Sequence, residues 1–322
     1  MGGGKERPQW ITEAATAAYI GLIALIAWTS GYVYILFPEL GALGHDILQR
    51  PRGTWAGAPV MLMGTPLLTA VAGTLITRHL PYGMPAVLLD VGFSVLAIRT
   101  LQSPIAPALS AGLLPLTLGI RSFWYPPALL IGTGVLAGIA VLRKRWAPAS
   151  APLGQSVEDR VDDAVERAPA GLSWVPFFVL FLLLAVAVGD LTGWRLVLFP
   201  PLVVIGFEAF AHTTLCPWAR RPVALGLACG LTACIGVACV KLLGVDPLGA
   251  MCSILMSAFI VRILDLHVPP ALAVGLLPFV MAHPNFQFPL AVMLGTAIET
   301  ALFLLWRRLV RLAHARRVPL RE

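Results

Sequence analysis

The chain has 322 residues, of which 58% are hydrophobic and 12% are charged, and its mean hydropathy is +0.84. This apolar content exceeds what one soluble core could bury, so it excludes a soluble globular domain and indicates a membrane protein with several spans. The net charge of +7 comes from cations at the ends of apolar segments, without a basic stripe interleaved with aromatics, which argues against a nucleic-acid partner.

The chain contains an internal repeat with an offset of 163 residues. Residues 55–145 align without a gap on residues 218–308, and 27 of the 91 positions are identical. We therefore divide the chain into a first membrane copy (1–145), a linker (146–174) and a second membrane copy (175–322) with a basic tail. The expected fold is an all-α polytopic membrane protein of two parallel copies, each with about four to six transmembrane or re-entrant helices.

Basic residues predict the orientation of the chain. The first apolar run, residues 14–37, is too long for a cleaved signal peptide and should remain as a membrane anchor. Positive residues lie before this run, at the end of the first copy and after the second copy: Lys5, Arg7, Arg143, Lys144, Arg145, Arg307, Arg308, Arg311, Arg316, Arg317 and Arg321. The positive-inside rule then places both termini and the linker in the cytoplasm, with the protein in the bacterial inner membrane.

Six apolar segments are expected in each copy. In the first copy they are 14–30, 32–44, 55–77, 84–98, 105–120 and 125–142. In the second copy they are 175–188, 194–210, 222–240, 248–261, 269–281 and 288–305. A full span needs about 20 residues, so the shorter segments indicate half-helices, tilted helices or re-entrant pieces. Four full spans with additional re-entrant pieces remain an alternative.

A proline interrupts the second segment of each copy. Leu36-Phe37-Pro38 corresponds to Leu198-Phe199-Pro200. Such prolines either break a helix, as in transporters that expose backbone groups to a solute, or kink a continuous helix. Glycines in the following segment suit close contact between helices: Gly64, Gly73, Gly226, Gly230 and Gly236.

An arginine followed by a proline-started segment occurs in both copies. Arg99 and Arg262 occupy equivalent positions at the ends of apolar helices. The segments after them predict half-helices that begin near Pro107 and near Pro269-Pro270, because proline suits the first helical turn. An arginine beside the N-terminus of a half-helix can bind an anion. The alternatives are an arginine that anchors the helix at the membrane interface and a proline-containing loop.

The linker holds a short predicted amphipathic helix. Ser156 precedes Asp159 as a capping pair, and Val157, Val161 and Val165 recur every four residues. This helix either docks on the cytoplasmic face, binds a partner, or is a solvated spacer, which is the interpretation that we favour.

Two polar residues are private to the second copy. His267 stands where the first copy has Pro104, and it is either a hydrogen-bonded structural residue or a proton carrier. Asp265 could pair with Arg262 or with His267, and pairing with Arg262 would weaken the second anion site.

The second copy resembles the HPP family of integral membrane proteins. The resemblance rests on His267-Val268-Pro269-Pro270-Ala271 before a short apolar stretch, on the Leu-Phe-Pro segment and on Pro222 at the start of a glycine-containing span. It covers about residues 175–308 and extends faintly to the first copy. The family is named for a His-Pro-Pro motif, here interrupted by Val268. The resemblance implies a compact multi-helix membrane domain and, for plant and cyanobacterial members, nitrite transport.

These observations favour a transporter or channel-like permease for a small inorganic anion, with nitrite implied by the resemblance. The predicted site residues are Arg99, Pro107, Arg262, Asp265, His267, Pro269 and Pro270. The alternatives are a structural or assembly subunit without a solute path and, less favoured, an intramembrane enzyme, since no HExxH motif or aspartate pair is recognisable. The five cysteines form no CxxC pair, so no metal or other cofactor is expected. The expected partners are the small anion and the lipid bilayer, and a homo-oligomer is left open.

Overall fold

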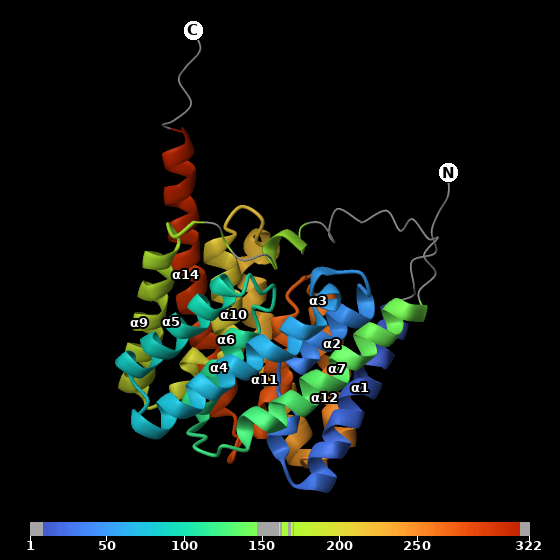
Figure 1. Cartoon of the computed structure of the whole chain (residues 1–322). Coiled ribbons are helices and arrows are strands. Elements are labelled where there is room, and N and C mark those ends of the chain that lie inside the picture. The colour runs from blue at the N-terminus through green and yellow to red at the C-terminus, as the bar shows by residue number, and fades with distance from the viewer. Residues whose placement is uncertain (1–8, 147–160, 162, 167–168, 170, 316–322) are drawn as a thin grey trace, which may run out of the picture.

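The computed structural model of the chain describes residues 9–146, 161, 163–166, 169 and 171–315. Over these residues the fold is helical, without any strand (Figure 1). Six of the described helices are long and apolar enough to cross a membrane, so the chain is a polytopic helical membrane protein, as predicted. These helices are α1 (Gln9–Ser30), α4 (Pro59–His79), α7 (Tyr125–Trp146), α9 (Val175–Thr192), α11 (Pro222–Leu243) and α14 (Gln287–Ala315).

Shorter helices lie between the long ones. The α-helices among them are α2 (Leu40–Gln49), α3 (Thr54–Gly57), α5 (Met84–Thr100), α6 (Ala108–Leu118), α10 (Pro200–Ala211), α12 (Pro247–Ile263) and α13 (Pro270–Leu276). The 3-10 helices are η1 (Val33–Ile35), η2 (Arg195–Leu198), η3 (Pro217–Arg220) and η4 (Leu277–Val280). At about 1.5 Å per residue, helices as short as α2 or α6 cover only about half of a bilayer core.

The elements follow the same order twice. Helices α4 and α11 begin at Pro59 and Pro222, and α5 and α12 begin at Met84 and Pro247, so both pairs keep the offset of 163 residues. In Figure 1 the chain enters and leaves both sets of helices on one side of the body, where linker residues 163–166 also lie. We call this side the linker face. This is the arrangement that two parallel copies would have.

Proline breaks the helix in two places of each copy. α2 begins two residues after Pro38, following η1 and a turn, and α10 begins at Pro200. The Leu-Phe-Pro segments therefore break a helix and do not kink a continuous one. α6 and α13 begin immediately after Pro107 and Pro269, as predicted for half-helices that start at proline.

Glycine brings the half-helices close to the long helices in both copies. A Cβ atom on Gly73 of α4 would lie 1.9 Å from the carbonyl oxygen of Gly112 on α6. A Cβ atom on Gly236 of α11 would lie 2.2 Å from the carbonyl oxygen of Gly275 on α13. Only glycine fits at these crossings. Gly64, also predicted to be a packing residue, instead has open space around its Cβ position, so that prediction is wrong.

The two copies pack against each other through equivalent helices. α1 packs against α12 and α9 packs against α5, so the first helix of each copy contacts the fourth long segment of the other. In the interior, α2 packs against α13 and α10 packs against α6. Half-helices of both copies thus meet in the centre of the protein.

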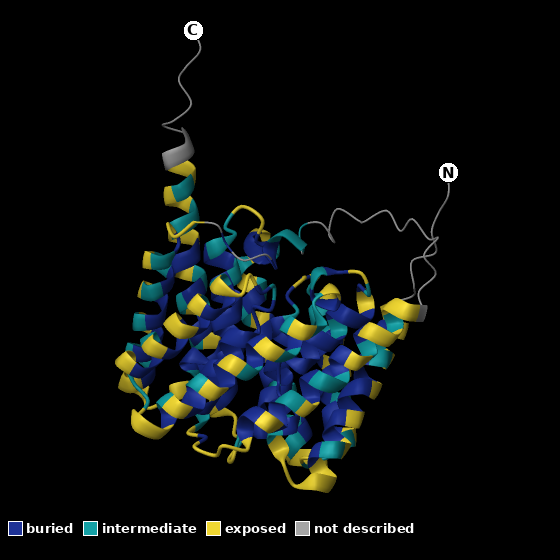
Figure 2. Ribbon diagram, viewed as in Figure 1, coloured by how far each residue is buried: buried dark blue, intermediate teal, exposed yellow. Residues whose placement is uncertain are grey.

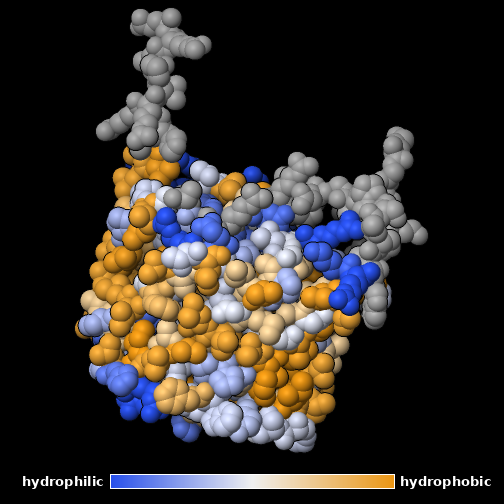
Figure 3. All heavy atoms as spheres, viewed as in Figure 1, coloured by the Kyte–Doolittle hydropathy of each residue, from blue (hydrophilic) through white to orange (hydrophobic). Residues whose placement is uncertain are grey.

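The outer surface is apolar around the body. Figure 2 shows buried residues filling the interior, while exposed residues lie along the outer sides and at the loops. In Figure 3 hydrophobic side chains cover much of the sides, and hydrophilic side chains gather near the linker face and at the opposite end. Large apolar side chains are exposed on the long helices, among them Leu22, Leu25, Leu68, Val71, Leu75, Leu227 and Leu231. This distribution is that of an integral membrane protein.

Candidate functional site

The two repeated arginines lie at the last turns of α5 and α12. Arg262 Nη1 lies 3.0 Å from Glu13 Oε1, and its guanidinium stands 5.6 Å above the ring of Phe259. Arg99 Nη1 lies 3.5 Å from the carbonyl oxygen of Gly171. Neither arginine lines the cavity that contains His267, so the structure does not bring the two arginines together with the rest of the predicted anion site.

Asp265 forms neither of the two predicted pairs. Its Oδ2 lies 3.0 Å from Arg221 Nη2, and both side chains are exposed, at 80% and 55%. Asp265 has a φ of +48°, and Gln102, its counterpart in the first copy, has a φ of +49°. A left-handed residue after the helix is therefore common to both copies, and an exposed pair of this kind contributes little to stability.

Three predicted residues do line one cavity. His267, Pro269 and Pro270 border a partly open cavity of about 30 Å³, which has room for about one water molecule. Both copies and the linker contribute to its walls, and we call it the Arg50 pocket. The polar and aromatic residues that line it include Arg50, Trp55, Glu166, Glu208, Trp218 and His267.

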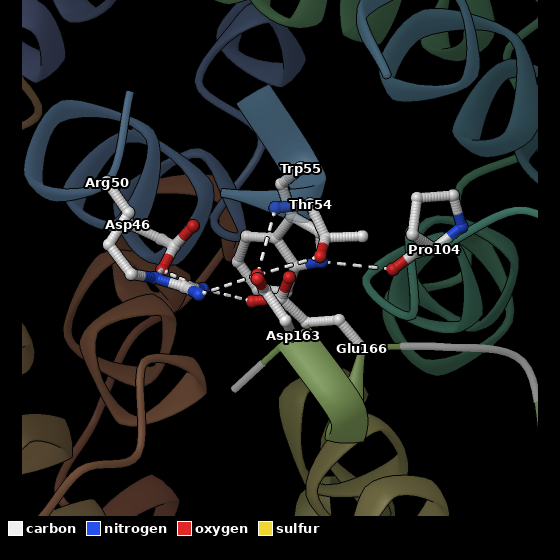
Figure 4. Close-up of polar contacts among 7 residues, drawn as sticks. All are labelled: Asp46, Arg50, Thr54, Trp55, Pro104, Asp163 and Glu166. Atoms are coloured by element: carbon white, nitrogen blue, oxygen red, sulfur yellow. Dashed lines mark hydrogen bonds and ion pairs between the residues drawn. The ribbon is translucent and has the colours of Figure 1, made fainter. Parts of the chain in front are cut away.

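Arg50 is the cation of this pocket (Figure 4). It follows the last residue of α2, and its side chain is only 8% exposed. Its Nε donates to Asp46 Oδ1 at 2.7 Å, its Nη1 donates to Asp163 Oδ1 at 3.1 Å, and its Nη2 pairs with Glu166. The linker therefore docks on the copies through Asp163 and Glu166, and the preferred interpretation of a solvated spacer does not hold for these residues. Ser156, Val157 and Asp159 lie outside the described residues.

Cys216 also lines the Arg50 pocket, between α10 and η3. Burial raises the pKa of its thiol well above the ordinary value, and the negative charges of Glu299 and Glu208 raise it further, against hydrogen bonds from the backbone of Ala219 and Trp218. The thiol is therefore protonated at neutral pH and poorly reactive. Its location makes it a useful reporter of access to this pocket.

A second polar cluster lies inside the first copy, along one turn of α6. Ser110 Oγ donates to Glu39 Oε1 at 2.5 Å, and Tyr125 Oη donates to the carbonyl oxygen of Ala111 at 2.8 Å. Beside Gly112, the position where a Cβ would stand is 2.9 Å from Asp90 Oδ1 and 2.8 Å from Ser94 Oγ. We call Glu39, Asp90, Ser94, Ser110 and Tyr125 the acid site.

The acid site is fully buried and holds two carboxyl groups. Glu39, Asp90, Ser94, Ser110 and Tyr125 are all 0% exposed. Within the described part of the chain, Glu39 Oε2 and both carboxyl oxygens of Asp90 have no hydrogen-bond partner, and neither residue forms an ion pair. An unpaired carboxylate in an apolar interior is strongly unfavourable, so these groups require a bound proton or another ligand to neutralise them.

The corresponding place in the second copy is not acidic. At the offset of the repeat, Asp90 corresponds to Ser253, Ser110 to Ala273 and Tyr125 to Phe288. Ser253 Oγ donates to the carbonyl oxygen of Gly275 at 2.7 Å, so this copy uses the position to hold α13. Pro201 stands where the first copy has Glu39.

The second copy instead carries one buried acid elsewhere. Glu299 of α14 is 0% exposed, and neither of its oxygens has a hydrogen-bond partner among the described residues. It interacts electrostatically with Glu208, which lines the Arg50 pocket. Leu136 occupies the equivalent position in the first copy. The titratable groups of the two copies are thus placed differently within a common arrangement of helices.

Comparison of this chain with protein families, with curated proteins and with solved structures finds no match. The resemblance to the HPP family therefore stays a prediction. Among the described residues, no group of three or more His, Cys, Asp and Glu side chains is arranged to hold a metal ion.

The acid site has a signal in the sequence. Asp90 is the one acid of α5, and Glu39 follows Pro38 at a helix break, so both acids lie inside apolar runs. An acid in an apolar run is a candidate for function by itself. The repeated arginines drew attention because they occur twice, whereas the acid site occurs in one copy only. Arg50 could not be recognised because the sequence does not show that the linker returns to it.

Proposed function

We propose that this chain is a membrane transporter that moves a small inorganic anion together with a proton. The observation that carries the proposal is the acid site: two fully buried carboxyl groups, Glu39 and Asp90, which have no cationic partner and contact the same turn of α6. A purely structural membrane domain gains nothing from such groups, whereas proton-coupled transporters need them.

The coupling follows from charge. When Glu39 and Asp90 are protonated, they are neutral and can donate hydrogen bonds to an anion. When they lose their protons, the site holds two negative charges and repels an anion. The anion therefore binds well only to the protonated site, and this mutual dependence is what couples the two fluxes.

The half-helices supply the route. α2 runs from Glu39, its N-cap, to Arg50 at its C-cap, so about 15 Å of helix joins the acid site to the Arg50 pocket. The positive N-terminal ends of α2 and α6 both lie beside the Glu39–Ser110 hydrogen bond. We infer that an anion enters through the Arg50 pocket and reaches the acid site where half-helices of the two copies meet.

The proposal includes an orientation. Described cations at the linker face include Arg143, Lys144, Arg145, Arg308 and Arg311, and fewer lie at the opposite end. By the positive-inside rule, the linker face and both termini lie in the cytoplasm, and the membrane is the bacterial inner membrane. Labelling of single cysteines at positions 146 and 122 with an impermeant reagent in whole cells tests this. Reaction at position 122 alone is expected, and reaction at position 146 contradicts the orientation.

The transport proposal is tested by flux in proteoliposomes. Nitrite, nitrate and formate uptake is measured with and without an inward proton gradient, for the native chain and for Glu39→Gln and Asp90→Asn. We expect the gradient to accelerate uptake of at least one anion by about tenfold in the native chain and to have little effect in either variant, because the proton sites are lost. Ser253→Ala, at the equivalent position of the second copy, is the matched control and should keep its dependence on the gradient.

Two results would reject the proposal. Full acceleration by the gradient in both acid variants would remove the acid site from the coupling. Absence of flux for every anion with the native chain would favour the second candidate function, a structural or assembly subunit. One observation favours that candidate: the cavity between the copies has a volume of only about 30 Å³, and Arg99 and Arg262 lie outside it.

A further inference from the structure

The linker places a carboxylate oxygen in a site built for an anion. Asp163 Oδ1 accepts hydrogen bonds from three donors of the first copy: Arg50 Nη1 at 3.1 Å, the backbone N–H of Thr54 at 3.2 Å and the Thr54 hydroxyl at 2.8 Å. The three donors converge on one point (Figure 4). Glu166, only 7% exposed, pairs with Nη2 of Arg50, which also lies 2.5 Å from Asp46 Oδ1.

The donors belong to the membrane domain, and the acceptors belong to the linker. Arg50 and Thr54 flank the short turn between α2 and α3, and Asp46 holds the Nε edge of Arg50 from within α2. If the linker lifts, the donors of Arg50 and Thr54 that Asp163 and Glu166 now occupy become available to another acceptor. A guanidinium with its Nη edge free binds planar oxyanions through two hydrogen bonds.

We propose that Arg50 and Thr54 form a binding site for a small planar oxyanion of the carboxylate or nitrite type, and that the linker occupies this site with its own carboxylates, Asp163 and Glu166. An incoming anion competes with the linker for the same donors. This inference rests on the proposed function in taking the Arg50 pocket as the entrance for the solute. It adds the entry site and the segment that closes it.

The contact has features of a reversible one. Arg50 and its three carboxylates, counted alone, have a net charge of −2, and Glu208 lines the same pocket. Three carboxylates share one guanidinium, so an anion that displaces Asp163 and Glu166 leaves Asp46 in place. The second copy lacks both donor residues: His212 corresponds to Arg50 at the offset of 162 residues set by the Leu-Phe-Pro segments, and Pro217, which has neither an N–H nor a hydroxyl, corresponds to Thr54 at the offset of 163 residues.

Cys216 reports whether the pocket is closed. In full-length protein with Cys229, Cys234, Cys239 and Cys252 replaced by Ala, the rate of alkylation of Cys216 by N-ethylmaleimide is measured in detergent. The linker substitutions Asp163→Asn and Glu166→Gln together should accelerate alkylation about tenfold, since two charge-assisted contacts are lost. Sodium formate at increasing concentration should then slow the reaction, whereas sodium chloride should not.

The arginine is tested in the same background. With both linker substitutions present, Arg50→Gln should leave alkylation fast and remove the protection by formate, and Arg50→Lys should retain only part of it because lysine lacks the planar fork. Unchanged alkylation in the linker variant would show that the linker does not close the pocket. Equal protection by formate with and without Arg50 would show that Arg50 is not the anion site.

A disulfide tests closure during transport. Thr54→Cys with Asp163→Cys, in a chain without other cysteines, joins two side chains that now lie 2.8 Å apart. Because both substitutions alter the site itself, uptake is compared within this variant and should be at least tenfold lower in the oxidised protein than in the reduced protein. Continued uptake through the oxidised protein would overturn closure by the linker. If no form of the protein transports anions, while formate still protects Cys216 through Arg50, then the proposed function fails and the binding site stands.

Discussion

Two equivalent half-helices of this protein differ at their centres. In the first copy, α6 places Ser110 against a buried glutamate and Gly112 against a buried aspartate. In the second copy, α13 has Ala273 and Gly275 at the same positions, and Gly275 faces two serines. The helices and their glycine crossings are alike, but the charge-bearing groups are not. The two copies therefore share the close packing of this half-helix, while the buried acids beside it occur in the first copy only.

The largest effect is expected on stability, at the glycine crossings that both copies share. Gly73→Ala and Gly236→Ala would each place a methyl group within about 2 Å of a facing carbonyl oxygen. Both should destabilise the fold by about 3 kcal/mol or more, because the facing atom is backbone and cannot move aside. Thermal unfolding in detergent measures this.

Gly64→Ala on the same helix is the control. Its Cβ position is open, so it should be neutral or stabilise slightly, by up to about 1 kcal/mol. If Gly73→Ala keeps the unfolding temperature of the native chain while Gly236→Ala lowers it, then the two glycine crossings contribute unequally to stability, and the two copies are less alike than described.

The next largest effect, on proton-driven anion uptake, should differ between equivalent substitutions in the two copies. Asp90→Ser makes the first copy resemble the second, and it should reduce proton-driven anion uptake about tenfold while preserving the fold, because removal of an unpaired buried carboxyl leaves no partner unsatisfied. Ser253→Ala should change uptake less than about twofold. An equal loss in both variants, measured in proteoliposomes, would contradict the assignment of the chemistry to one copy.

A smaller effect concerns the thiol at the junction between the copies. Because burial raises its pKa, Cys216 stays protonated as the pH rises from 7 to 9. An ordinary thiol, whose pKa is about 8.5, ionises over this range. Its alkylation rate in folded single-cysteine protein should therefore rise much less than about tenfold between these pH values. In denaturant, the alkylation rate of Cys216 should rise with pH as it does for an ordinary thiol. The same pH dependence in the folded and the denatured protein would show that the pocket is open.

The smallest effect is expected at the repeated arginines. Arg99→Gln and Arg262→Gln should each change uptake by less than about twofold, since both side chains lie outside the Arg50 pocket and the Arg262–Glu13 pair is partly exposed. Arg50→Gln should reduce uptake more than either. A strong loss in Arg99→Gln and Arg262→Gln alike would restore these residues to the anion site and weaken the role of Arg50.

Much of the architecture could be predicted from local patterns. The helix starts after Pro107 and Pro269, the interruptions at Pro38 and Pro200 and the membrane character all follow from residues close in the sequence. Whether Pro38 and Pro200 break a helix or kink it could not be decided from the sequence, because proline permits both and the outcome depends on tertiary packing.

The candidate site was less predictable. His267, Pro269 and Pro270 do line a cavity, but the cation beside them is Arg50, more than two hundred residues away in the sequence. Arg99 and Arg262 drew attention by repetition, yet repetition identifies what the scaffold shares. Glu39 and Asp90 have no acidic counterparts in the second copy, so comparison of the copies does not point to them. Their burial is evident only in the tertiary structure, where both lie against α6.

By itself, the sequence determined that the chain is apolar enough to reside in a membrane, that its elements occur twice and that proline starts its half-helices, because these properties depend on composition and on neighbouring residues. The tertiary structure decided which charged groups lie in the interior and which lie at the rim. Glu39 and Asp90 meet through α6, and Arg50 meets Asp163 across 113 residues. Such pairings depend on which helices pack together, and charge alone does not specify them.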